Sequence, residues 1–330
     1  MKPVTVDSFT PTERVYCIKA PEMGMNMNAS FTLHPIAPYR LDYTVFTLRR
    51  RSKNSVDCWD GQNYTRVFNL DNKPIRVKVK QTNSLNNPEL LVSLDEPLHP
   101  VVQEKIKHLI EMMLGLNRDL ADFYKMAKDD ARLSPLVFQF MGVKPPRFPS
   151  LFEALINAIS CQQISLDAGL HIQNRLVQHV GIKMNYKNQV LNAFPTAEDV
   201  SYCSVAELRK IGYSTHKSET IIRLASTLKE EQFSFNCLEE KPNDEVIEWL
   251  CQFKGIGRWT AEYVLLRGLG RIEIFPSDDI GAQNNLQKLF HLEKKLDYKK
   301  TSEITALWYP YAGLVYFHLL LHKLDEKGAL

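Results

Sequence analysis

The stretch "FKGIGRWTAEYVLLRGLGRIEIFPSDDIGAQNNLQ", from Phe253 to Gln287, brings three features close together. Two glycines stand two residues apart in "GIG", an apolar segment with a tryptophan near its start follows, and two consecutive aspartates come after a proline. The glycines separate "DEVIEWLCQF" from "RWTAEYVLLRG", and both of these segments have the apolar spacing of a helix. The stretch therefore predicts two helices joined by a tight turn, for which glycine supplies the backbone freedom.

The turn has two interpretations, and "GIG" alone does not decide between them. In the simpler one it only connects two helices. In the other it is a helix-hairpin-helix, in which the backbone N–H groups of Gly255, Ile256 and Gly257 and the start of the next helix bind a phosphate, while Lys254 adds positive charge. We expect Gly257 to adopt a φ angle that other residues rarely use.

The two aspartates also have two interpretations. Ser277 or Asp278 is placed to cap the helix that begins "DIGAQNNLQKLF", and one carboxylate is sufficient for that purpose. Asp279 then falls in the first helical turn, where the positive end of the helix favours its ionised form. The pair is either ordinary decoration of a helix N-terminus or a fixed anion that follows a phosphate-binding turn.

The bulk composition describes an ordinary globular protein. The chain has 330 residues, 44% of them hydrophobic and 24% charged, which is enough for two domains. Its net charge of +3 is consistent with an anionic partner but does not require one. The six cysteines are scattered without a C-x-x-C pair, which predicts reduced thiols and no disulfide frame, zinc site or iron–sulfur cluster.

The sequence contains no obvious membrane signal. The first residues, "MKPVTVDSFTPTERVYC", lack the apolar core of a signal peptide. The longest apolar run, "YAGLVYFHLLLH", is shorter than the roughly 20 residues that a helix needs to cross a bilayer. We therefore expect a cytoplasmic or nucleoid-associated protein without membrane contact.

The two parts of the chain have different periods. Residues 31–94 alternate, as in "PIRVKVKQ", where Ile75, Val77 and Val79 share one face, and the "DG" at residues 60–61 predicts a hairpin. After Pro100, "VVQEKIKHLIEMMLGL" has helical spacing and predicts a helix across the sheet, and helical patterns dominate from residue 119 onward. The expected fold is an α+β domain with an antiparallel sheet and a helix at residues 1–115, followed by a mainly α-helical domain at residues 116–330.

The combination of "GIGRWTA", the arginine in "LLRG" and "FPSDD" resembles the signature of the helix-hairpin-helix DNA glycosylase superfamily. Within it, the chain is most similar to the 3-methyladenine DNA glycosylase II branch, which acts in alkylation repair. The resemblance continues upstream in "FPSLFEALINAISCQQIS" and "AELRKIGYSTHKSETIIRLA" and downstream in "ALWYPYAGLVYFHL". The combined match is far more specific than any one of these pieces.

This resemblance implies an enzyme that flips a damaged nucleotide out of the duplex and breaks its N-glycosidic bond. Asp279 takes the place of the family's catalytic carboxylate, which stabilises positive charge on the sugar, and Asp278 is then the helix cap. Relatives that also cut the strand have a Schiff-base lysine where this chain has Trp259. The resemblance therefore implies a monofunctional enzyme.

The resemblance also assigns the binding residues. Trp259 and Tyr263 match aromatic walls of the base pocket, where a cationic alkylated base gains cation–π attraction, and Trp308 is placed to help close that pocket. Gln163 in "CQQIS" matches the residue wedged into the gap left by the flipped base. Without the resemblance, the two aromatic residues of the hairpin helix are ordinary helix core, and the glutamine is a polar helix end. Ile280 departs from relatives that carry an aromatic residue there, which leaves the set of accepted lesions open.

The sequence thus predicts a monofunctional DNA N-glycosylase for alkylated purines, similar to DNA-3-methyladenine glycosylase II. We expect it to act on damaged double-stranded DNA as a monomer, with no cofactor and no metal. Two alternatives stay open: a glycosylase for oxidised or deaminated bases, and a non-catalytic helix-hairpin-helix DNA-binding module. The lack of a C-x6-C-x2-C-x5-C run argues against the iron–sulfur branch, and Asp279 argues against a pure binder, which has no use for a carboxylate facing phosphates.

Overall fold

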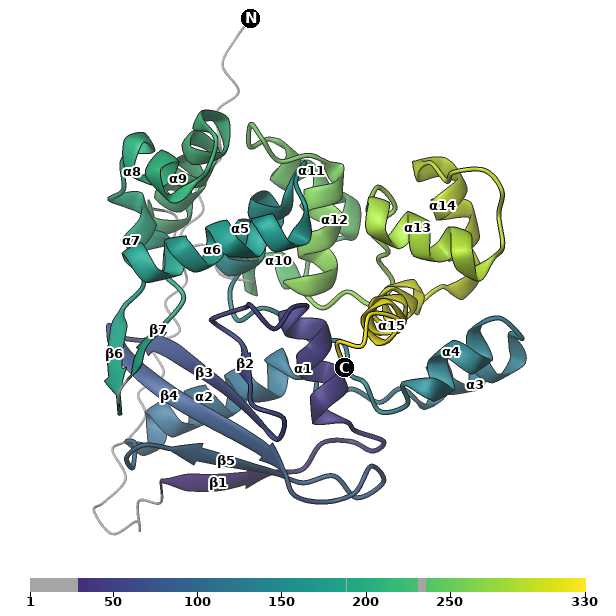
Figure 1. The fold of residues 1–330 in the computed structure, drawn as a ribbon, viewed down its shortest axis with the longest axis horizontal. Helices are drawn as coiled ribbons and strands as arrows, with labels where there is room; N and C mark the ends of the chain where they lie inside the picture. Colours follow the sequence, from purple (N-terminus) through teal and green to yellow (C-terminus); the bar gives the residue numbers. More distant parts are fainter. Residues whose placement is uncertain (1–28, 188, 231–235) are drawn as a thin grey trace, which may run out of the picture.

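A five-stranded antiparallel sheet forms the N-terminal part of the protein. The computed structural model describes residues 29–187, 189–230 and 236–330 (Figure 1). The strand order is β1-β5-β4-β3-β2. The strands are β1 (Ser30–Leu33), β2 (Cys58–Trp59), β3 (Asn63–Leu70), β4 (Lys73–Gln81) and β5 (Leu90–Leu94). The predicted antiparallel sheet is confirmed.

The alternation seen in the sequence describes β4 well. Val77 and Val79 are buried on the core face, whereas Lys80 is exposed. The predicted "DG" hairpin is also present, because β2 pairs antiparallel with β3 across that turn. Gly61 has a φ of +99°, and the Asp60 carboxylate accepts the backbone N–H groups of the two residues that follow the glycine.

Two helices accompany the sheet, of which the sequence predicted one. The predicted helix is α2 (Pro100–Met113), which buries Ile106 and Ile110 in the core formed with the sheet. The other, α1 (Leu41–Arg49), lies inside the segment that was expected to be strands only. Its β-branched residues favour a strand, and it is buried on several sides, so it shows no clear amphipathic period.

The rest of the described chain is mainly helical, as predicted, and Figure 1 shows these helices gathered on one side of the sheet. An unpredicted hairpin of β6 (Lys183–Tyr186) and β7 (Gln189–Asn192) interrupts them. The helices are α3 (Ala121–Asp129), α4 (Leu133–Gln139), α5 (Leu151–Cys161), α6 (Leu166–Val180), α7 (Ala197–Ser201), α8 (Val205–Ile211), α9 (Thr215–Glu230), α10 (Asn236–Glu239), α11 (Asn243–Cys251), α12 (Arg258–Arg267), α13 (Ile280–Leu289), α14 (Tyr298–Thr305), the 3₁₀ helix η1 (Ala306–Trp308) and α15 (Ala312–Asp325).

The sheet and the helices share one hydrophobic core. It joins residues such as Val79 of β4 to Ile156 of α5 and Val264 of α12. A second cluster surrounds α15 and includes residues of α3, α4 and α13. The division into domains at residue 115 stays a prediction, since the core is continuous across it.

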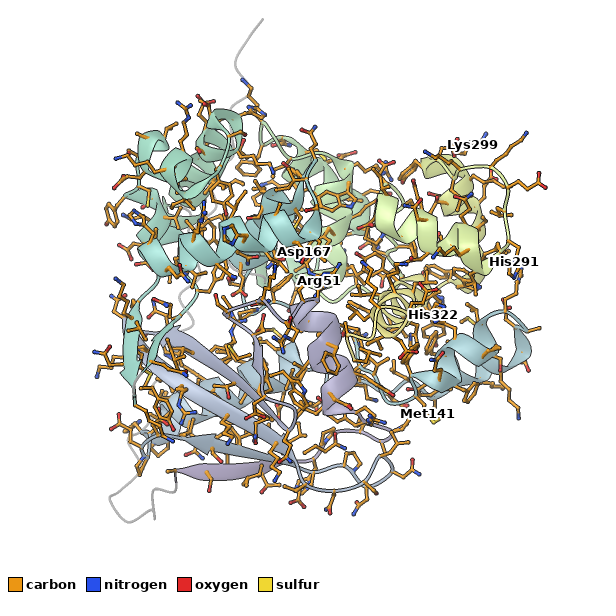
Figure 2. The ribbon with its side chains drawn as sticks, viewed as in Figure 1. Arg51, Met141, Asp167, His291, Lys299 and His322 are labelled. Carbon is orange, nitrogen blue, oxygen red and sulfur yellow. The ribbon has the colours of Figure 1, made fainter. Side chains whose placement is uncertain are left out.

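Polar contacts also join the two parts. Arg51, just after α1, pairs with Asp167 of α6 at 3.4 Å, and Figure 2 shows the two side by side. Among the described residues, no single helix is long and apolar enough to cross a membrane. The helical segment 298–308 and α15 pass that test only as a pair bent by 107°.

Candidate active site

The glycine turn lies between α11 and α12, as predicted, but its two glycines differ. Gly255 has a φ of +98°, and a Cβ there would stand 2.3 Å from Oγ1 of Thr220. Gly257 is the N-cap of α12 with a φ of −104°, and a Cβ there would meet nothing within 4 Å. The expectation of an unusual φ at Gly257 is wrong: the left-handed turn and the close approach both fall on Gly255.

A side chain just after α5 and one on α9 hold this turn in place. The Thr220 hydroxyl donates to the carbonyl of Lys254 at 3.0 Å. The Gln162 side-chain amide donates to the carbonyl of Gly255 at 3.1 Å and to Oγ1 of Thr260 at 3.0 Å. The hairpin is therefore tied to elements far away in the sequence, and its shape does not depend on the glycines alone.

The turn offers unused backbone donors. The N–H groups of Gly255 and Gly257 donate to no described residue, and Lys254 is exposed beside them. Ile256 differs, because its N–H donates to the carbonyl of Phe253 at 2.9 Å and its side chain is buried. The prediction that Ile256 presents a free N–H is therefore wrong, since the donation that makes the turn already uses it.

Asp279 has two roles. It is the N-cap of α13, and its Oδ1 accepts the N–H of Ala282 at 2.9 Å. Its other oxygen, Oδ2, accepts from the indole N–H of Trp259 at 3.4 Å and from the Tyr316 hydroxyl at 3.2 Å. The prediction that Asp278 is the cap is wrong: Asp278 is exposed, and the extended backbone of an N-cap occurs one residue later.

The loop before Asp279 is anchored to the hairpin helix. Glu262 of α12 accepts the backbone N–H of Ser277 at 3.1 Å and pairs with Arg258 at 2.9 Å. Burial raises the pKa of Glu262 above its usual value. Because α12 also carries Trp259, this anchor fixes the catalytic candidate relative to its indole partner.

One cavity of about 1880 Å³ lies between the hairpin, the turn from α5 to α6, α13 and α15. Most of the predicted site residues lie in its wall. They are Gln163, Gly255, Ile256, Gly257, Trp259, Tyr263 and Asp279. The tertiary fold therefore brings together residues that are more than a hundred positions apart.

The aromatic wall has two layers. Trp259 is half-buried, whereas Tyr263 is only 1% exposed, and their ring centroids are 5.6 Å apart at an interplanar angle of 36°. The guanidinium groups of Arg50 and Arg267 lie 5.9 and 5.6 Å from the Tyr263 ring. Because these cations already face Tyr263, any cation–π attraction for a bound base falls mainly to Trp259.

Trp308 does not belong to this wall. It lies in η1 with 2% exposure, its indole N–H donates to Asp130 at 3.4 Å, and its ring packs on Phe290. Its position in the second core cluster contradicts the prediction that it lines the base pocket. The adjacent apolar helix instead contributes Tyr316, whose pKa is raised by burial. The sequence signal for Tyr316 was a tyrosine inside an otherwise apolar helix.

Gln163 occupies an exposed turn at the cavity. Its φ is +56°, directly after Gln162 has ended α5. The side chain is exposed at the cavity wall, whereas the neighbouring Gln162 is committed to the hairpin. This position is compatible with the predicted wedge, which stays a prediction.

Arg50 is a cavity residue that sequence reasoning missed. It ends α1 with a φ of +60°, and its guanidinium donates to Oδ1 of Asn157 on α5. The run "RRR" at residues 49–51 was the available signal, but no pattern in the sequence places that run beside the hairpin. Within the described residues, no group of three or more His, Cys, Asp or Glu side chains is arranged to hold a metal ion.

Comparison with known proteins agrees with this geometry. The family model described as "HhH-GPD superfamily base excision DNA repair protein" matches residues 156–310. A Schizosaccharomyces pombe protein named DNA-3-methyladenine glycosylase 1 is 33% identical over 186 residues, which are 53% of this chain and 75% of that protein. The chain belongs to the HhH-GPD superfamily.

Further relatives match a larger share of the chain. A Bacillus subtilis DNA-3-methyladenine glycosylase is 29% identical over 242 residues, covering 72% of this chain and 80% of the relative. The solved 3-methyladenine DNA glycosylase of Archaeoglobus fulgidus superposes with a TM-score of 0.77 at 25% identity, covering 91% of this chain and all of that one. The predicted superfamily and its alkylation-repair branch are confirmed: this member is similar to the DNA-3-methyladenine glycosylase II hydrolases of N-glycosyl bonds.

Proposed function

We propose that this HhH-GPD protein is a monofunctional DNA N-glycosylase that flips an alkylated purine out of double-stranded DNA and hydrolyses its N-glycosidic bond. The proposal rests on the different roles of the two carboxylate oxygens of Asp279. One carboxylate oxygen caps α13, while the other is held at the cavity by Trp259 and Tyr316. A carboxylate fixed in this way is oriented before substrate arrives.

The chemistry follows from that geometry. As the bond between C1′ and the base breaks, its electron pair leaves with the base and positive charge develops on the sugar. Oδ2 of Asp279 stabilises this cation, and a water molecule adds to C1′ and loses a proton. An alkylated base is already a good leaving group, so the reaction needs no general acid for it.

The absence of strand cleavage is supported by two residues. Trp259 stands where a Schiff-base enzyme has lysine, and an indole cannot form that bond. Lys217 lies at the cavity, but its ammonium donates to the carbonyl of Gln162 at 2.7 Å and to that of Ser160 at 3.4 Å. Both observations favour hydrolysis over lyase chemistry.

DNA is held by the turn beside the cavity. The free N–H groups of Gly255 and Gly257, with Lys254 alongside, bind a backbone phosphate. Gln163, exposed across the cavity, fills the gap left by the flipped base. The protein acts as a monomer and associates with DNA in the nucleoid.

The experiment is a release assay on alkylated, oxidised and deaminated duplexes, with free bases separated by chromatography. We expect 3-methyladenine from methylated DNA and an intact strand until alkali is added. Borohydride should trap no covalent adduct. Release of oxidised bases alone, or efficient trapping, would contradict the proposal, and binding without any release would leave only the DNA-binding module.

A variant sharpens this assay. Trp259→Ala should lose excision of cationic bases while keeping its affinity for undamaged duplex, because the ring contacts the base and not the backbone. Equal losses of excision and of affinity for undamaged DNA would instead assign Trp259 to the core of α12.

A further inference from the structure

The turn between α5 and α6 holds one residue in a backbone conformation that L side chains rarely adopt. Gln163 has a φ of +56°, and its side chain is exposed at the cavity wall. A residue other than glycine keeps such a conformation only where the surrounding contacts fix the backbone. The contacts that fix it are found on the preceding residue, Gln162.

Gln162 is held by two distant parts of the chain. Its side-chain amide donates to the carbonyl of Gly255 in the hairpin and to the hydroxyl of Thr260 on α12. Its backbone carbonyl accepts from the ammonium of Lys217 on α9 at 2.7 Å. That carbonyl lies in the planar peptide group that joins Gln162 to Gln163, so Lys217 fixes the plane from which the next residue extends.

The ammonium of Lys217 is directed at the end of α5. The side chain is half-buried, and its Nζ also donates to the carbonyl of Ser160, in the last turn of that helix, at 3.4 Å. The last carbonyls of a helix have no partner within the helix and carry partial negative charge, so a cation from another element stabilises them. No carboxylate among the described residues pairs with this ammonium. The charge of Lys217 therefore serves the turn and not a counter-ion.

We propose that Lys217 is a positioning residue for the wedge turn, residues 162–165. Together with Gln162 it locks this turn to the hairpin, so that a duplex bound by the hairpin meets the Gln163 side chain at the gap left by the flipped base. Lys217 then contributes to nucleotide flipping and not to the breaking of the glycosidic bond. The inference rests on the proposed glycosylase activity and on Gln163 as the wedge, and it adds a residue that acts through both.

The test separates flipping from bond cleavage under single-turnover conditions. A single 7-methylguanine is placed opposite cytosine in one duplex and opposite an abasic analogue in the other, where flipping breaks no base pair and costs less. Lys217→Met should slow base release about 10-fold opposite cytosine, the rate equivalent of one charge-assisted hydrogen bond, and less than about 2-fold opposite the abasic analogue. Lys217→Arg can donate to the same carbonyls and should recover most of the loss.

Lys254 provides the matched control, because it is an exposed lysine beside the hairpin whose side chain is not bonded to the wedge turn. Lys254→Met should slow release from both duplexes by a similar factor, since a phosphate contact does not depend on the base pair. Both rates come from one preparation, so partial unfolding of a variant does not change their ratio.

Gln163→Gly removes the wedge itself and should reproduce the change of ratio seen in Lys217→Met. Adding Lys217→Met to Gln163→Gly should change the ratio no further, because the two residues act on one step. Additive effects of the two substitutions would overturn the positioning role.

A second measurement follows flipping without chemistry. A 2-aminopurine next to the lesion becomes more fluorescent when its neighbour leaves the stack, and Lys217→Met should reduce this rise in the duplex with cytosine. Wild-type protein that flips the lesion but releases no base would disprove the proposed function and keep this inference. Base release with the same ratio in Lys217→Met as in wild type would overturn the inference and keep the proposed function. A loss of affinity for undamaged duplex that explains the whole defect would also overturn it, because Lys217 would then be a phosphate contact.

Discussion

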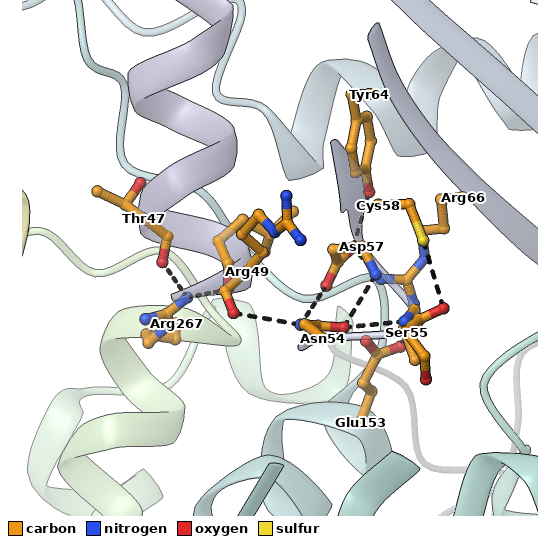
Figure 3. Close-up of polar contacts among 12 residues, drawn as sticks. Thr47, Arg49, Asn54, Ser55, Asp57, Cys58, Tyr64, Arg66, Glu153 and Arg267 are labelled. Atoms are coloured by element: carbon orange, nitrogen blue, oxygen red, sulfur yellow. Dashed lines mark hydrogen bonds and ion pairs between the residues drawn. The ribbon is translucent and has the colours of Figure 1, made fainter. Parts of the chain in front are cut away.

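Burying an arginine removes its charge from water, and two places in the molecule differ in how this is compensated. In the seam cluster of Arg66, Asp57, Glu153 and Tyr64, the guanidinium pairs with Asp57 at 2.7 Å and with Glu153 at 2.5 Å (Figure 3). In the pocket pair of Arg50 and Arg267, no described carboxylate answers either charge, and unpaired nitrogens remain on both side chains. Burial is similar in the two places; only the compensation differs.

The two places differ in whether the fold neutralises the buried arginine charge with carboxylates of its own. The seam cluster joins β3 to the first turn of α5, and two carboxylates of the fold neutralise its guanidinium, although Nε of Arg66 has no hydrogen-bond partner. Of the pocket pair, Arg50 lines the cavity and Arg267 is fully buried next to Tyr263; their hydrogen bonds go to an amide, a thiol and backbone carbonyls. A buried charge that the fold leaves uncompensated is therefore a better guide to the site than a buried charge as such.

The largest expected effect is that of replacing Asp279, whose carboxylate both caps α13 and faces the cavity. Asp279→Asn should slow base release about 1000-fold, because an amide cannot stabilise the sugar cation. Folding and lesion-DNA affinity should change little, since asparagine caps a helix as well as aspartate does. Single-turnover excision, gel shift and thermal melting measure the three properties.

Asp278→Asn is the matched control, because it removes the same charge from the exposed neighbour that caps nothing. It should excise at close to the wild-type rate. A strong defect in Asp278→Asn, with activity retained in Asp279→Asn, would reverse the assignment of the two aspartates.

The seam cluster should control stability and not chemistry. Arg66→Met leaves two buried carboxylates without a cation, and we expect the free energy of unfolding to fall by about 3–5 kcal/mol. The excision rate per folded molecule should stay near wild type. Urea unfolding and active-site titration measure the two quantities.

Arg76→Met supplies the comparison for that variant. Arg76 of β4 pairs with Asp95, and both side chains are more exposed than those of the seam cluster, so its loss should cost less, about 1 kcal/mol. Equal effects of the two substitutions would show that burial does not distinguish the seam cluster.

The two hairpin glycines are expected to have different roles: Gly255 in the stability of the fold and Gly257 in DNA binding. Gly255→Ala places a Cβ against Thr220 at a positive φ and should destabilise the protein by about 1–3 kcal/mol. Gly257→Ala enters open space at an ordinary φ, so stability should hold while affinity for damaged and undamaged duplex falls by a similar factor. If Gly257→Ala binds undamaged DNA as wild type does, the turn is only a connection between helices.

The smallest effect is a pH dependence in the seam cluster. Burial raises the pKa of Glu153 from 4.5 to about 7, and the negative charge of the nearby Asp57 acts in the same direction. A raised carboxyl pKa contributes stability that is fully present below about pH 4.5 and is lost as the pH rises through 7. The unfolding free energy of wild type, relative to Glu153→Gln, should therefore fall between pH 5 and pH 8 by an amount on the order of 1 kcal/mol. Parallel pH profiles of the two proteins would contradict this sign.

Periodic and local patterns were sufficient for much of the fold. The alternation in "PIRVKVKQ", the "DG" turn and the helix after Pro100 each depend on neighbours in the chain, and the structure confirms all three. Helix α1 was missed for the opposite reason, because its surroundings come from distant elements and hide its period. The hairpin and the family resemblance were also available from sequence, since both lie in one contiguous stretch.

The sequence by itself determined the family, the change from an antiparallel sheet to a mainly helical part, and the motif that carries Asp279, because each of these is encoded by residues close together in the chain. Tertiary structure decided which aspartate caps α13, which glycine needs its missing side chain, and that Tyr316 and not Trp308 reaches the cavity. It also decided that Arg50 lies beside Asn157, 107 positions away. These outcomes depend on contacts between distant segments, and burial and hydrogen-bond partners across such contacts have no periodic trace in the sequence.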